Sequence, residues 1–170
     1  MVGALGAFWG VAGVALLLGS AMYRLGAVAL TAFAHELSPS HWASLLLVIL
    51  FMAYAEGYRG FQQRFAPRVA ARARYLRQHP RALHLLLAPL FCMGFFHATR
   101  RRRLTSLSVT FTIVALILCV RLLPQPWRGI IDAGVVIGLA WGLFSLLFFA
   151  IRAFTAERFD YAPDVPEDQH

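Results

Sequence analysis

Long blocks of apolar residues, separated by short polar segments, dominate the chain. A helix needs about 20 mostly apolar residues to cross the hydrocarbon core of a membrane, which is about 30 Å thick. The blocks therefore predict four membrane-spanning helices, over residues 12–34, 41–61, 104–123 and 130–151. This pattern indicates an all-α integral membrane protein, a small helical bundle in which residues 1–152 form one polytopic membrane domain.

The first apolar block is longer than one membrane span. Residues 2–34 are interrupted by a single charge, Arg24, and a helix of this length would reach about 50 Å. We expect the residues before position 12 to lie at or in the inner interface. A cleaved signal peptide is the alternative, because Gly19-Ser20-Ala21 offers small residues. However, signal peptides normally carry a positive charge before the apolar run, and here none precedes it.

A basic, amphipathic segment follows the second span. Val69, Ala73 and Leu76 recur at helical spacing. Arg68 and Arg72 share another face of the same helix. Apolar and basic residues at these intervals are typical of a helix that lies in the plane of the interface. The sequence therefore predicts a separate amphipathic helix over residues 67–78, opening at Pro67.

Residues 82–98 are apolar but are interrupted by Pro89 and Gly94. If this segment crosses the membrane, the arginines other than Arg24 divide nine to six between the two sides. If it dips in and returns, thirteen of those fifteen lie on one side. Arginine concentrates in cytoplasmic loops, so residues 82–98 are predicted to be a re-entrant or interfacial helical element. Both termini are then cytoplasmic, and we expect a bacterial inner (plasma) membrane.

The composition supports a membrane protein with a lipid-facing basic surface. Hydrophobic residues make up 59% of the chain and charged residues 14%, while the net charge is +8. Eleven of the sixteen arginines lie in two blocks on either side of residues 82–98. Arginines beside membrane spans contact anionic headgroups, so we expect lipid partners and no nucleic acid. The predicted lipid-binding residues are Arg64, Arg68, Arg72, Arg100, Arg101, Arg102 and Arg103.

Two ion pairs are predicted at membrane depth. Arg24 lies near the middle of the first span, where an arginine costs about 2.5–3.5 kcal/mol on insertion scales and needs a partner. Glu56 is the acid nearest to it in depth, so an Arg24–Glu56 pair is expected. The alternative pairs Glu56 with Arg59 on the same helix, while the Arg24 side chain extends along the helix to the membrane interface. Arg121 and Asp132 lie at matching depth on the last two spans, where a salt bridge between them would stabilise the hairpin.

Glycines at intervals of four residues predict where helices approach closely. Gly134, Gly138 and Gly142 form such a stripe on the last span, and Gly6 and Gly10 repeat the spacing near the N-terminus. Small residues let helix backbones pack together in lipid. The stripe is expected to pack inside the bundle, and the alternative is a homo- or hetero-oligomer.

Histidines raise the question of a cofactor. His84 and His97 flank Cys92-Met93 in the re-entrant element and are the candidate ligands for a metal or haem. No spacing matches a known metal motif, so the first expectation is that the protein binds no cofactor. The acidic tail, residues 153–170, is predicted to be disordered.

No catalytic motif stands out, so the sequence favours a non-enzymatic role. The first interpretation is an accessory or scaffold protein that acts through helix packing and contact with anionic lipids. The second is a small transporter or channel subunit that uses the Arg24–Glu56 pair. The third is a His-ligated membrane oxidoreductase.

Overall fold

A computed structural model describes residues 2–80, 82–95, 100–156, 158–163 and 165. Over these residues the regular secondary structure is entirely helical. Four helices are long and apolar enough to cross a membrane, namely Val2–Ala32, Pro39–Gln78, Arg103–Arg121 and Trp127–Thr155. The prediction of an all-α membrane bundle with four spans is confirmed.

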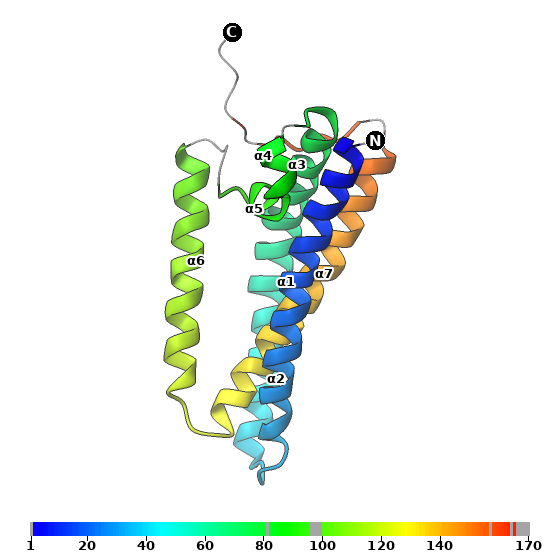
Figure 1. The fold of residues 1–170 in the computed structure, drawn as a ribbon. Helices are drawn as coiled ribbons and strands as arrows, with labels where there is room; N and C mark the ends of the chain where they lie inside the picture. Colours follow the sequence, from blue (N-terminus) through cyan, green and yellow to red (C-terminus); the bar gives the residue numbers. More distant parts are fainter. Residues whose placement is uncertain (1, 81, 96–99, 157, 164, 166–170) are drawn as a thin grey trace.

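Helices α1 (Val2–Ala32) and α7 (Trp127–Thr155) run antiparallel along the bundle, so the start of α1 and the end of α7 lie at the same end (Figure 1). Helix α7 packs against α1 and against the long helix between them in the sequence. The residues before position 12 continue the first span without a break. They are the first turns of α1, and Ala7 and Val11 are buried in the core.

The second span continues without a break into the basic segment. Helix α2 (Pro39–Met52) leads into a π-helix, η1 (Ala53–Phe65), and then into α3 (Ala66–Gln78). The helix predicted over residues 67–78 corresponds to α3, with Pro67 in its first turn, but it continues from the second span instead of standing as a separate helix. A proline normally clashes with the carbonyl four residues earlier. Here the preceding turn is wide, with the Ala66 N–H donating to Phe61 O five residues back, and the proline sits at the start of α3.

Two short helices follow α3 and do not cross the bundle. Helix α4 (Ala82–Leu86) and helix α5 (Ala88–Met93) meet at Leu87, and α5 ends at Gly94 with φ of 84°. Only glycine adopts that left-handed conformation without strain. Both helices lie at the end of the bundle where α3 stops and α6 (Arg100–Arg121) begins (Figure 1). The two arginine blocks are therefore at the same end.

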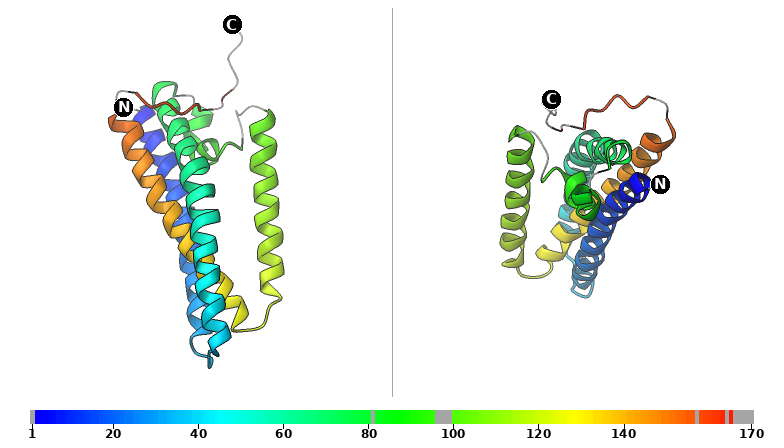
Figure 2. Two further views of the ribbon diagram at one scale, coloured as in Figure 1. Left: turned by 180° about the vertical axis from the view of Figure 1, so that it is seen from behind. Right: turned by 45° about the horizontal axis from the view of Figure 1, so that its top comes forward.

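Helix α6 stands apart from the other helices in every view (Figure 2). Nearly all of its described side chains are exposed. A hydrogen bond of 3.3 Å from Ser106 Oγ to Met93 O joins its first turns to the end of α5. Helix α6 is therefore attached at its ends rather than packed along its length.

The main hydrophobic core lies at the arginine-bearing end, where α1, α3, α5 and α7 meet. Small side chains dominate this core, so the four helices approach closely. Its buried members are Ala7, Val11, Val14, Ala66, Val69, Ala70, Ala73, Leu76, Ala88, Phe91, Cys92, Leu146, Phe149, Ala150 and Ala153. Phe159 and Val165, from the segment after α7, pack against it.

Candidate functional site

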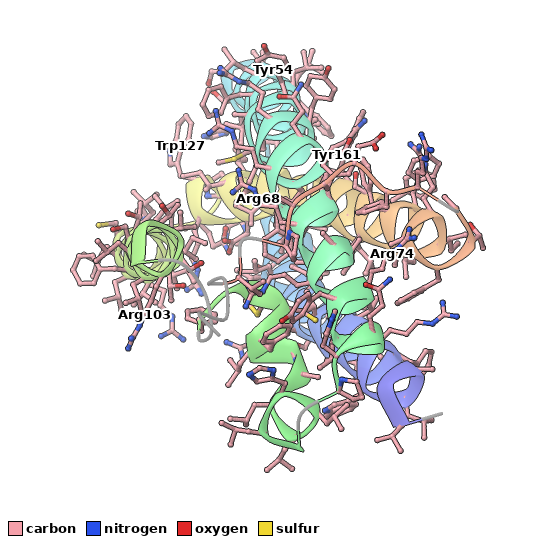
Figure 3. All side chains as sticks on the ribbon, turned by 90° about the horizontal axis from the view of Figure 1, so that it is seen from above. Tyr54, Arg68, Arg74, Arg103, Trp127 and Tyr161 are labelled. Atoms are coloured by element: carbon pink, nitrogen blue, oxygen red, sulfur yellow. The ribbon has the colours of Figure 1, made fainter. Side chains whose placement is uncertain are left out.

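The candidate site is the end of the bundle that carries the two arginine blocks, here called the arginine end. It comprises the end of η1, helices α3, α4 and α5, the start of α6 and the segment after α7. Seen from this end, Arg68, Arg74 and Arg103 come from two separate helices (Figure 3). Arg64 and Arg103 are exposed, and Arg68 is half-buried. These three predicted lipid-binding residues are accessible at one end of the molecule.

Arg72 does not belong to this accessible set, and its burial argues against the predicted role in lipid binding. Its side chain is only 1% exposed. The guanidinium lies 4.3 Å above the Phe91 ring, Nε donates to Phe91 O at 2.6 Å, and Nη1 donates to Pro163 O at 2.9 Å. Arg72 therefore fastens α3 to α5 and to the C-terminal segment.

The sequence contained a signal for the burial of Arg72. Val69 and Leu76 precede and follow it by three and four residues, so all three share one face of a helix. Val69 is 1% exposed and Leu76 is fully buried. Helical phase could therefore have indicated an arginine on the apolar face, and the prediction that Arg72 shares a different face with Arg68 is wrong. The carbonyl groups that accept its hydrogen bonds come from distant parts of the chain and had no local signal.

The described part of the C-terminal segment, for which the sequence predicts disorder, folds back over α3. Helix α7 continues to Thr155, and the segment bearing Tyr161 then crosses α3 (Figure 3). Arg74 Nη1 donates to Ala156 O at 2.9 Å, and the Tyr161 ring packs edge-on against Phe149 at 5.6 Å between centroids. Basic side chains on α3 thus hold the backbone of the tail.

The cofactor hypothesis rested on His84 and His97. His84 is buried on α4, and its ring stacks on Phe91 at 4.7 Å between centroids. His97 lies outside the described residues. Within the described part, no three His, Cys, Asp or Glu side chains lie together as metal ligands would. His84 is therefore placed as a packing residue beside the Arg72–Phe91 contact.

The glycine stripe of α7 faces the helix formed by α2 and η1. A methyl group added at Gly134 would lie 2.6 Å from Val48 Cγ1, and one at Gly142 would lie 2.5 Å from the Phe61 ring. Close approach of these backbones therefore depends on glycine. Because this face is covered inside the bundle, it is not open to a second molecule.

The N-terminal glycines serve a different contact. A methyl group at Gly6 would overlap the Leu85 side chain of α4, and one at Gly10 would lie 2.7 Å from Cys92 Sγ of α5. These glycines let the two short helices sit directly against α1. The re-entrant element is thus held by the first span.

The predicted Arg24–Glu56 pair is not formed. Arg24 is exposed on α1, whereas Glu56 packs against α7, where a methyl group at Gly138 would lie 2.8 Å from Glu56 Oε2. Depth explains the error: Arg24 lies eight residues before the end of α1, and Glu56 lies seventeen after the start of α2. At 1.5 Å per residue these positions differ by about 13 Å. Glu56 Oε2 is buried and has no hydrogen-bond partner among the described residues.

The predicted Arg121–Asp132 bridge is also absent from the described part of the chain. Asp132 Oδ2 lies 3.8 Å from Arg128 Nε, one turn earlier on α7. Arg121 ends α6, which diverges from α7 after the turn and stands apart (Figure 1). Equal depth did not bring the two side chains together because these two helices do not pack.

One polar contact between helices was not predicted. Trp141 Nε1 on α7 donates to Gln62 Oε1 on η1 at 2.7 Å. Both residues line a cavity of about 300 Å³, together with Phe144, Ser145 and Phe148. A tryptophan N–H inside a membrane protein needs an acceptor, which is the signal that would have indicated this contact.

Comparison with protein-family models, with curated proteins and with solved structures finds no match to this chain.

Proposed function

We propose that this protein is a non-enzymatic accessory or scaffold protein of a membrane, and that its arginine end binds anionic lipid headgroups. One observation carries the proposal: exposed or half-buried arginines from η1, α3 and α6 gather at a single end of an apolar bundle. Each arginine near an anionic surface contributes about 1 kcal/mol to binding. By the preference of arginine for the inner side, this end faces the cytoplasm.

The packing at the arginine end supports a scaffold rather than a catalyst. Helices α4 and α5 do not cross the bundle, so they cover its end between the basic helix α3 and the start of α6. Hydrogen bonds from Arg72 and Arg74 hold the C-terminal segment against the same surface. Such a surface, fixed from several sides, presents its remaining arginines to headgroups in a constant arrangement.

The two ends of α6 provide a matched test. Arg103 and Arg121 are both exposed and lie at opposite ends of the same helix. Native mass spectrometry of the purified protein with phosphatidylglycerol or cardiolipin measures lipid retention. Arg103→Gln should lower the relative affinity about fivefold, from the loss of about 1 kcal/mol, while Arg121→Gln changes it little. Equal losses in the two variants would contradict a lipid site at the arginine end.

Glu56 favours a second candidate function, that of a small transporter subunit. Acidic residues within spans often belong to ion or proton paths, and Oε2 of Glu56 is buried without a hydrogen-bond partner in the described part of the protein. Proton flux into dye-loaded proteoliposomes tests this candidate. Flux that disappears in Glu56→Gln supports it, and absence of flux in the wild type removes it.

A further inference from the structure

Arg24 lies well inside the membrane on the outer surface of the bundle. The Phe33 ring, just after α1, packs against Trp42 at 6.0 Å between centroids, and tryptophan is typical of the membrane interface. Arg24 is nine residues before Phe33, which corresponds to about 13 Å along a helix. This distance places Arg24 near the middle of a hydrocarbon core about 30 Å thick.

The described part of the protein offers Arg24 no ion pair. Its side chain is exposed, and the carboxylate expected to pair with it, Glu56, packs against α7 instead. Arginines at this depth almost always face a bundle interior and pair with another group. An arginine on the outer surface therefore indicates that another protein covers this face.

The surface around Arg24 suits a close helix contact. Ser20 and Ala27, four residues before and three residues after Arg24, share its side of the helix and are exposed. Small residues at these intervals allow a second helix to approach the backbone of α1. Arg24, Ser20 and Ala27 thus form one continuous face.

A second copy of this chain does not provide the missing carboxylate. Of its eight acidic residues, two lie in the membrane spans, Glu56 and Asp132. Glu56 Oε2 is buried against α7, and Asp132 is buried and paired with Arg128. The remaining acids lie in the first loop and in the C-terminal tail. The partner must therefore be a different protein.

We infer that the outer face of α1, formed by Ser20, Arg24 and Ala27, docks a transmembrane helix of a second protein. That helix carries an aspartate or glutamate at the depth of Arg24, so that the two charges pair away from lipid. The inference rests on the proposed accessory role and deepens it, because it states which face receives the client protein and by what chemistry.

The test is photo-crosslinking in cells of the host, with a photoreactive amino acid at Ala27 in the full chain. A matched control carries it at Phe111, which is 76% exposed on α6. We expect the Ala27 probe alone to give a product in which the attached peptide is a transmembrane segment containing an acidic residue. Arg24→Leu should lower the yield of that product about tenfold or more. Arg24→Glu should abolish it, and arginine in place of the partner's acid should restore it.

Several outcomes would overturn the inference. These are a product with a second copy of the chain, adducts with lipid alone, a partner segment without an acid, or a yield unaffected by Arg24→Leu. Native mass spectrometry distinguishes failure of the docking inference from failure of the lipid proposal, because Arg24→Leu should leave lipid retention unchanged. Conversely, Arg103→Gln should leave the crosslink intact. Thermal stability of detergent-solubilised Arg24→Leu should match that of the wild type, which shows that the variant still folds.

Discussion

Replacing Arg72 is the sharpest test of the packing at the arginine end. Arg72→Leu removes hydrogen bonds to Phe91 O and Pro163 O and the contact with the Phe91 ring. Hydrogen bonds from charged donors contribute about 1.5–3 kcal/mol each, and the ring contact about 0.5–2 kcal/mol. Burial of the leucine side chain offsets part of this loss. We expect the free energy of unfolding to fall by about 3 kcal/mol.

Arg77→Leu is the matched control on the same helix. Arg77 is exposed, and its hydrogen bond to Phe154 O is long, at 3.4 Å, so its loss should cost less than about 0.5 kcal/mol. Arg72→Lys keeps the charge but cannot reproduce the planar fork of the guanidinium. The free energy of unfolding of Arg72→Lys should therefore lie between those of Arg72→Leu and Arg77→Leu.

The assay is equilibrium unfolding in mixed micelles of a mild detergent and dodecyl sulfate, followed by the circular dichroism of the helices. Limited proteolysis of the C-terminal segment gives a second readout, because Arg72→Leu should release Pro163 from α3 and expose the segment to cleavage. Equal stability of Arg72→Leu and Arg77→Leu would refute the reasoning. A loss of lipid retention in Arg72→Gln as large as in Arg68→Gln would show that Arg72 faces lipid after all.

Two further predictions concern helix packing and topology. Gly142→Ala should destabilise the protein in the same unfolding assay, because its methyl group would lie 2.5 Å from the Phe61 ring of η1. Gly19→Ala is the control and should be neutral or slightly stabilising, because its methyl group would meet no atom within 4 Å. Equal effects of the two substitutions would contradict the helix contact. Single cysteines are placed at Gln78, Arg103 or Glu36 in a background without native cysteines. In intact cells the cysteines at positions 78 and 103 should both resist an impermeant thiol reagent, while the one at position 36 reacts. Labelling of only one of positions 78 and 103 would show that the segment between them crosses the membrane.

The apolar blocks by themselves determined the four spans, because transfer of a helix into lipid depends on local composition and length. The non-crossing segment before α6 was also predictable. Its interruption by Pro89 and Gly94 and the one-sided count of arginines are both local properties of the chain, and in the structure α4 and α5 remain at one end of the bundle.

The tertiary structure alone decided which charges meet. Sequence gave the depth of Arg24 and Glu56 only to within several residues, and it gave no information on which side of α1 faces the bundle. Helix rotation and tilt depend on the packing of all the neighbouring helices at once, such as the contact of Gly138 with Glu56. The same holds for Arg72. Its helical phase was compatible with an apolar face, but only the folded-back tail and α5 supplied Pro163 O and Phe91 O as acceptors. A buried arginine is stable where such acceptors are fixed by distant parts of the chain, and local sequence does not encode their positions.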